Sequence, residues 1–378
     1  MKARVLVLAS IFVLVNLLIF SGGISLGGDS QRYLSGADNL LRGLPLQGRQ
    51  LSYSGYALLI AFCRLTRVGL PGVVFIQLLF AAAAAVALYD IGRRLHGRVA
   101  GLFAAGLYVA NPDIARWNAF ILTDSLYISL VILSVWCVHT AALRKRYWYI
   151  TAAAALCAAA LVRPNGLFLL AVAVLYLVSR AIEHKSLRRV AVSALVLAFV
   201  LGAFAASRFF QGGSKDHPEA TLRNGITGIN EWRVPMPSDP APVEGEGAAV
   251  FSYVARHPLA SFRLGITRVF VELIHVRPFY SFRHNLVLLM SLPFLYLLAL
   301  MGLKVQRDRS LTRLLLLAIG SQLFVVAITF ADSDGRFLLY VLPLVCLFSS
   351  CGVASLIDLY LLRRKSEVKR EVRVVAGQ

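Results

Sequence analysis

Long apolar runs separated by short polar segments dominate the pattern of residues along the chain. Many of these runs hold roughly 16–25 residues with almost no charge, which is about the length of helix that crosses a bilayer. The pattern therefore predicts an all-α polytopic membrane protein with about 10 transmembrane helices. The predicted spans are 5–26, 70–92, 98–111, 125–143, 147–162, 164–180, 189–207, 286–303, 313–330 and 336–362.

Basic residues set the expected orientation of these spans. Of the 39 Lys and Arg residues, 22 lie in six short clusters that alternate with the apolar runs. Cytoplasmic loops carry an excess of Lys and Arg, so we place all six clusters inside. The net charge of +20 then needs no nucleic-acid partner. The clusters are 1–4, 93–98, 144–146, 180–189, 304–313 and 363–373.

This orientation divides the chain into four expected parts. Residues 1–207 form an N-terminal transmembrane module with helices 1–7, and 286–362 form the C-terminal transmembrane helices. Between them, 208–285 is expected to be a mobile extracytoplasmic loop followed by an interfacial segment, because the loop is rich in Gly and Pro and has no period. Residues 363–378 are expected to form a cytoplasmic basic tail.

The first outside segment, 27–69, is predicted to lie on the membrane rather than across it. Two amphipathic stretches, about 30–42 and about 55–68, have apolar residues at helical spacing. The second stretch also carries Arg64 and Arg67 one turn apart on one face. Both are therefore expected to be interfacial helices.

The composition adds two further expectations. The first apolar run is longer than the apolar region of a signal peptide and no A-x-A site follows it, so we expect a retained helix. The five cysteines form no CxxC or zinc spacing, and most lie in apolar runs, where they are expected to pack as small apolar residues.

Four ionisable residues lie at the outside ends of the predicted helices, where burial near the hydrocarbon boundary is costly. Asp29 and Asp124 could each serve simply as a helix N-cap. Arg163 in "LVRPNG" could snorkel to lipid headgroups, and Arg336 in "DSDGRFLLYVLP" could snorkel or pair with a neighbouring acid. The pattern leaves open whether these residues converge.

The turn before Arg336 carries Asp332 and Asp334 in a D-x-D spacing. Such a pair can hold a divalent cation, but two acids in a turn are also common. No cofactor or metal site is firmly predicted; a divalent cation at this pair remains a minor alternative.

The order of these features resembles the GT-C superfamily of polyprenyl-phosphate-sugar-dependent glycosyltransferases, and most nearly its protein mannosyltransferase and lipid A aminoarabinose transferase branch. Five stretches carry the resemblance: "GGDSQRYLSGADNLLRG", "YSGYALLIAFCRLTRVG", "RRLHGRVAGLFAAGLYVANPDIARWNAFILTDSLYISL", "AALVRPNGLFLL" and "GRFLLYVLPLV". The chain departs from better-known members at Ser30, where many have a second acid. A folded C-terminal outside domain is not expected either, since only about ten helices fit.

The resemblance implies a role for each outside residue. Asp29 matches the first-loop acid that is taken as the catalytic base, and Asp124 matches a second acid that orients Asp29 or the acceptor. The donor phosphate needs positively charged side chains beside it, and guanidinium groups suit this role because their geometry matches the phosphate oxygens. The expected donor-phosphate-binding residues are Arg163 and Arg336, with Arg64 and Arg67 as weaker candidates.

The implied function is an inverting hexosyl- or pentosyltransferase of the extracytoplasmic face of a bacterial cytoplasmic (inner) membrane. Its partners would be membrane lipids, a polyprenyl-phosphate-sugar donor and a glycolipid, polysaccharide or protein acceptor. A transporter or flippase of a lipid-linked sugar is the main competing hypothesis, although no internal repeat is visible. Two weaker hypotheses are a ligase or polymerase that uses a diphosphate-linked glycan, and a non-catalytic scaffold.

Overall fold

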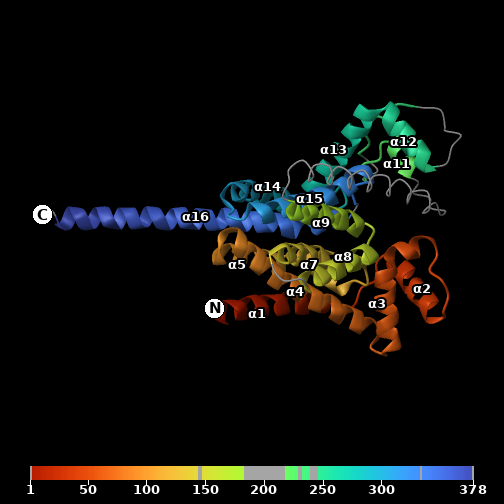
Figure 1. Ribbon diagram of the computed structural model, residues 1–378, viewed down its shortest axis with the longest axis horizontal. Helices are drawn as coiled ribbons and strands as arrows, with labels where there is room; N and C mark the ends of the chain where they lie inside the picture. The colour runs from red at the N-terminus through yellow and green to blue at the C-terminus, as the bar shows by residue number, and fades with distance from the viewer. Residues whose placement is uncertain are drawn as a thin grey trace.

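The computed structural model describes residues 2–143, 147–182, 218–228, 232–238, 246–332 and 334–376 (Figure 1). Helices form nearly all of the regular structure in these ranges. Their only β pairings are two isolated bridges, Ser25 with Phe120 and Ile226 with Arg233. The expected all-α fold class is confirmed.

Most long helices run side by side in one bundle, with both termini at the same end (Figure 1). The bundle helices are α1 (Lys2–Phe20), α4 (Gly69–His96), α5 (Arg98–Val109), α7 (Thr123–Leu143), α8 (Tyr147–Val162), α9 (Gly166–Ala181), α14 (Phe282–Val305), α15 (Arg309–Ile328) and α16 (Arg336–Ala376).

Five of the described helices are long and apolar enough to cross a membrane: α4, α7, α14, α15 and the first 32 residues of α16. Four shorter apolar helices accompany them, Leu6–Phe20, α5, α8 and α9. The predicted span 189–207 lies outside the described residues. The chain is thus a multi-pass membrane protein, while the predicted number of spans stays a prediction.

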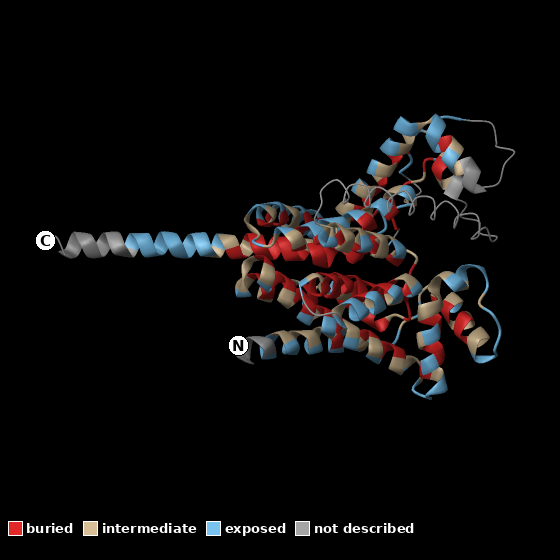
Figure 2. Cartoon of the chain, viewed as in Figure 1, coloured by how far each residue is buried: buried red, intermediate tan, exposed pale blue. Residues whose placement is uncertain are grey.

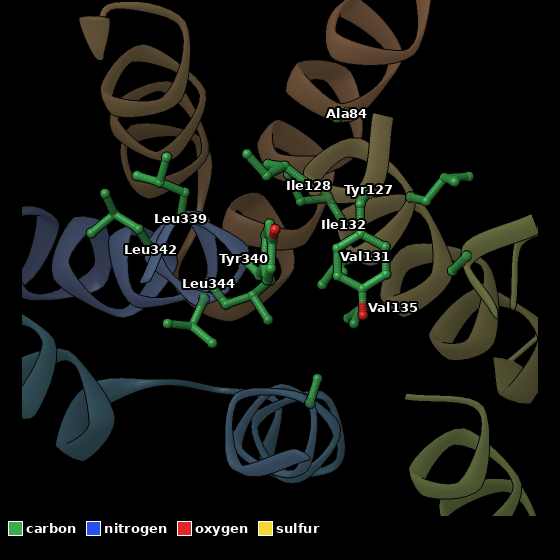
Figure 3. Packing of buried hydrophobic residues seen from close by; sticks show 14 of the residues in the cluster. Ala84, Tyr127, Ile128, Val131, Ile132, Val135, Leu339, Tyr340, Leu342 and Leu344 are labelled. Carbon is green, nitrogen blue, oxygen red and sulfur yellow. The ribbon is translucent and has the colours of Figure 1, made fainter. Parts of the chain in front are cut away.

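Helices α7 and α16 form the centre of the bundle. In α16, 94% of the most apolar stretch is buried, against 28% in α14, so α16 is surrounded by protein and α14 faces outward (Figure 2). Tyr127 of α7 and Tyr340 of α16 pack edge to face, with ring centroids 4.9 Å apart (Figure 3). A helix that is apolar all round is expected at such a central position.

Two predicted helix ends differ from the observed ones. Helix α1 ends at Phe20 rather than near 26, because "SGG" follows and Gly23 has a φ of 80°, which a helix cannot continue through. Helix α16 continues to Ala376, so the expected tail 363–378 is helical over its described part.

The first outside segment folds into two short helices, α2 (Ser30–Leu41) and α3 (Ser54–Leu65), joined through η1 (Gly48–Tyr53). Both lie where amphipathic helices were predicted. Their apolar faces meet at Tyr33 and Tyr56, whose rings pack edge to face at 5.2 Å. Helices α2 and α3 together cover the end of the bundle where α7 begins (Figure 1).

The segment 208–285 was predicted to be a loop followed by an interfacial segment, and its described part contains helices in both regions. Its described residues form α11 (Pro218–Arg223), α12 (Glu246–Arg256) and α13 (Pro258–Ile274). The buried Arg268 of α13 donates to the backbone oxygens of Ile226, Ala327 and Thr221. These long-range contacts tie α13 to α11 and the residues after it, and to the end of α15.

Candidate active site

Asp29 is brought to the start of α7 by backbone pairing. The Ser25 N–H donates to the Ala119 oxygen at 2.9 Å, and the Ile121 N–H donates to the Ser25 oxygen at 3.0 Å. The Ser30 hydroxyl then donates to the Ile121 oxygen at 2.8 Å. The first outside loop is therefore fastened to the segment that leads into Asp124.

Asp124 is fully buried in the first turn of α7 and holds Arg163, which follows α8. Nη1 of Arg163 lies 3.0 Å from Oδ1 of Asp124 and 2.9 Å from Oγ1 of Thr123. The Tyr340 hydroxyl donates to the same Oδ1, and its ring lies 4.9 Å below the Arg163 guanidinium. Asp124 of α7, Tyr340 of α16 and Arg163, which follows α8, thus form one buried unit.

Arg336, at the start of α16, contacts three carboxylates. Its Nη2 lies 3.0 Å from Oδ1 of Asp332, and its Nη1 lies 3.3 Å from Oδ2 of Asp29 and 3.9 Å from Oδ2 of Asp124. Arg32 binds the other oxygen of Asp29 at 3.2 Å. The four residues that carry the prediction, Asp29, Asp124, Arg163 and Arg336, therefore meet in one cluster, which we call the arginine–carboxylate cluster.

Exposure differs sharply among the three carboxylates that Arg336 contacts. The side chain of Asp29 is 31% exposed, against 4% for Asp332 and 0% for Asp124. Burial alone would raise the pKa of Asp332, but the adjoining Arg336 charge and its hydrogen bonds hold that pKa below the usual range. Asp29 is the carboxylate of this group that a substrate can reach most readily.

A second ion pair lies behind the turn that carries Asp332 and Arg336. The fully buried Glu272 accepts from the N–H groups of Asp332 at 2.9 Å and Leu338 at 2.7 Å. Arg277 lies 3.4 Å from Glu272 and donates to the Asp332 oxygen at 3.0 Å. Burial raises the pKa of Glu272 to about 7, against the opposing Arg277 charge and these N–H donors. The Glu272–Arg277 pair therefore holds the backbone of Asp332 and Leu338, on either side of Arg336.

Gly335 is required immediately before Arg336. Its φ is 67°, and a Cβ added there would lie 1.7 Å from Cε1 of the buried His275. Both the backbone conformation and the close ring exclude a larger residue. Gly335 therefore fixes the backbone immediately before Arg336.

The contacts of Asp29, Asp124, Arg163 and Arg336 bear on the alternative roles of helix capping, snorkelling and local pairing. Asp29 occupies the N-cap position of α2 but makes no side-chain cap bond, and Asp124 accepts from side chains rather than from a backbone N–H among the described residues. Arg163 is buried and paired, so it does not snorkel. Arg336 does pair with the neighbouring acid Asp332, and it also reaches Asp29 and Asp124.

The two weaker candidates are not joined to this cluster by any contact in the described residues. Arg64 pairs with Asp38 of α2. Arg67 is exposed just after α3, with a φ of 62°. Their proposed part in phosphate binding stays a prediction.

The D-x-D pair does not act as a unit. Asp332 is occupied by Arg336, whereas the backbone oxygen of Asp334 accepts from the Tyr280 hydroxyl at 3.0 Å. Across the described ranges, no group of three or more His, Cys, Asp or Glu side chains has the arrangement of a metal site.

Sequence reasoning missed several members of this cluster and its support. Tyr340 lies one turn after Arg336, a spacing that places both on one helix face. Glu272 in "FVELIHVRP" is an acid in an apolar run, and that signal marks a costly buried charge. The missed residues are Arg32, Thr123, Glu272, Arg277 and Tyr340.

These features define a class: a multi-pass helical membrane protein with a partly exposed carboxylate and buried arginines at one end of its bundle. Residues 54–207, fewer than half of the chain, match a family model described as dolichyl-phosphate-mannose-protein mannosyltransferase. No curated protein sequence matches the chain.

Two solved structures share the fold. One is the archaeal oligosaccharyltransferase AglB from Archaeoglobus fulgidus, in complex with an inhibitory peptide and a dolichol-phosphate; it is 13% identical, with a TM-score of 0.50 over 96% of this chain and 52% of that one. The other is ArnT from Cupriavidus metallidurans bound to undecaprenyl phosphate, which is 14% identical, with a TM-score of 0.51 over 93% of this chain and 60% of that one. The expected resemblance to the GT-C glycosyltransferases is confirmed.

Proposed function

We propose that the protein transfers a sugar from a polyprenyl-phosphate donor to an acceptor, with inversion, at the extracytoplasmic face of a bacterial inner membrane. The observation that carries the proposal is the contact of Asp29 with Arg336, which also reaches Asp124, the partner of Arg163. The family match over 54–207 supports it, as do two structural neighbours that hold a dolichol-phosphate and undecaprenyl phosphate. The chain spans only 52% and 60% of those neighbours.

Asp29 is the proposed base. In the transfer, an acceptor oxygen or nitrogen attacks the anomeric carbon, the bond from that carbon to the phosphate oxygen breaks, and polyprenyl phosphate leaves with the electron pair. The acceptor's proton passes to Asp29, whose contribution as a positioned base is about 10²- to 10⁴-fold. The buried Asp124 and Asp332 are poorly placed for this step, since they hold arginines and are closed to an acceptor.

The two arginines are the proposed ligands of the departing phosphate. Both are held by carboxylates from behind, which keeps the guanidinium groups oriented before a donor arrives, and preorganised charge is what stabilises a leaving anion. We assign Asp124 the task of orienting Arg163 and Arg336, in place of a direct role on the acceptor.

A transporter of a lipid-linked sugar fits these positions less well. That class binds its substrate near the bilayer midplane, at breaks in spanning helices. Here the clustered charges stand at helix starts, in the first turns of α7 and α16. We therefore prefer an enzyme acting at one membrane face.

The test compares wild type with Asp29→Asn in lipid, using a panel of radiolabelled polyprenyl-phosphate sugars. Asp38→Asn is the matched control, because Asp38 is an exposed acid of α2 whose partner is Arg64. We expect one donor to bind all three proteins, with turnover lost only in Asp29→Asn. Equal turnover in Asp29→Asn would remove the base assignment, and failure of wild type to bind any donor would remove the function.

A further inference from the structure

A polar cavity of about 420 Å³ lies at the opposite end of the bundle from Asp29. It is enclosed by the ends of α4 and α7 and the starts of α5 and α8, and its wall includes Asp90, Arg93, Arg94, Arg98, Thr140 and Trp148. Thr140 lies 16 residues after Asp124 on α7, which is about 24 Å along a helix. The cavity is therefore far from the arginine–carboxylate cluster, and the proposed transfer makes no use of it.

The cavity carries more positive than negative charge. Asp90 is the one acid among the described residues of its wall, and it accepts from Arg93 at 2.7 Å, from Arg94 at 2.8 Å and from Nε1 of Trp136 at 3.0 Å. Asp90 thus fixes two guanidinium groups at the cavity wall while offsetting only one of three positive charges. Arg98, from the start of α5, is exposed at its rim.

Two buried donors in the wall have no protein partner within the described ranges. These are Nε1 of Trp148 and Oγ1 of Thr140, the latter on a side chain that is 1% exposed. A buried donor without a partner is costly, and each such group in a folded protein calls for a ligand or water. The positive-inside bias and the α4 C-terminus explain why arginines gather here, but not these two donors.

We propose that this cavity binds the phosphate group of an anionic membrane lipid. Guanidinium forks match phosphate oxygens, and the indole and hydroxyl donors add two further contacts to the same anion. The cluster 93–98 is assigned to the cytoplasmic membrane surface, where anionic headgroups are concentrated. A lipid headgroup and a soluble anion share the phosphate chemistry. We prefer the headgroup because the cavity is placed at the membrane surface.

The test reconstitutes the full chain in phosphatidylcholine nanodiscs that contain increasing brominated phosphatidylglycerol. Bromine quenches nearby tryptophans, and Trp136 and Trp148 are two of the four in the chain. The variant is Arg93→Gln with Arg98→Gln, and the control is Arg309→Gln with Arg313→Gln. The control removes the same amount of charge, because Arg309 and Arg313 are also exposed. These two residues lie near the end of α4, since the N–H of the neighbouring Arg307 donates to the Leu95 oxygen at 2.7 Å.

Wild type and control are expected to be quenched half-maximally at the same low fraction of anionic lipid. The cavity variant is expected to need about tenfold more, with an unchanged melting temperature. Trp148→Phe keeps an aromatic ring and removes the indole donor, and half-maximal quenching of its remaining tryptophans is also expected to need more anionic lipid. Equal quenching of the cavity variant and wild type, or an equal loss in the control, would overturn the proposal.

A second arm separates the two sources of phosphate. Inorganic phosphate is added to protein in phosphatidylcholine alone, and tryptophan emission is recorded. No change is expected, since a lipid headgroup is also held by its place in the bilayer. A change that the Arg93→Gln, Arg98→Gln variant abolishes would assign the cavity to a soluble anion and overturn the lipid assignment.

Discussion

Arg336 and Asp29 lie 307 positions apart in the chain, yet Nη1 of Arg336 is 3.3 Å from Oδ2 of Asp29. One guanidinium thus reaches from the start of the last helix to the first outside loop, and Asp332 holds it from the other side. The proposed base and a proposed phosphate ligand are therefore in direct contact, and four predictions concern the residues that hold this pair.

Arg336→Ala is expected to weaken donor binding at least about tenfold, because a hydrogen bond to a charged group contributes about 1.5–3 kcal/mol. Turnover should fall further, since the leaving phosphate loses its charge partner. Binding is measured by isotope retention in lipid. Arg42→Ala is the control, as Arg42 is exposed just after α2; equal losses in both variants would contradict the assignment of Arg336.

Tyr340→Phe is expected to destabilise the protein by about 1–3 kcal/mol, because a buried Asp124 oxygen loses a hydrogen-bond donor. The ring that stacks on Arg163 is kept, so donor turnover should change only a few-fold. The measurement is thermal denaturation in lipid beside the turnover assay. Tyr360→Phe, at an exposed position of α16, should leave both unchanged.

Protonation of Glu272 is expected to make the free energy of unfolding depend on pH. Its pKa is raised to about 7 in the folded protein, from an ordinary value near 4.5. Between these values the folded chain binds a proton that the unfolded chain has lost, so this group's contribution falls as pH rises, by up to about 1.4 kcal/mol per pH unit. The stabilisation from Glu272 is fully present below about pH 4.5 and is lost above about pH 7.

Glu272→Gln removes this titration. The melting temperature of wild type, relative to that of the variant, should therefore fall between about pH 4.5 and 7. The two proteins are compared by scanning calorimetry across that range. Parallel curves would show that Glu272 does not change its protonation on folding.

Gly335→Ala is expected to destabilise the turn before Arg336 and to lower donor binding with it. The reason is a φ of 67° together with the His275 ring, which occupies the place of the new methyl group. Gly320→Ala is the control, because nothing lies within 4 Å of that Cβ and the residue is inside α15. Alanine there should stabilise the helix by roughly 0.5–1 kcal/mol.

The sequence predicted the helical bundle because apolar length and basic clusters are local signals. It also singled out Asp29, Asp124, Arg163 and Arg336, because each places charge near an apolar boundary. It did not predict that Glu272 and Arg277 would pair behind Asp332, since that pairing depends on how α13 packs against the turn. Helix α12 lies in the stretch that its Gly and Pro content marked as a loop, whereas α13 lies where an interfacial segment was predicted.

The cation shared by Asp29 and a donor phosphate has a kinetic consequence for the proposed transferase. In the empty protein Oδ2 of Asp29 is paired with Arg336 and Oδ1 with Arg32, so an acceptor that binds alone meets a carboxylate whose oxygens are already engaged. When a donor phosphate takes over part of the Arg336 guanidinium, Oδ2 of Asp29 is released to accept a hydrogen bond from the acceptor beside the sugar that is to be transferred. Substrates should therefore add in a compulsory order, donor before acceptor, and initial-rate patterns should show a sequential mechanism with the donor as leading substrate.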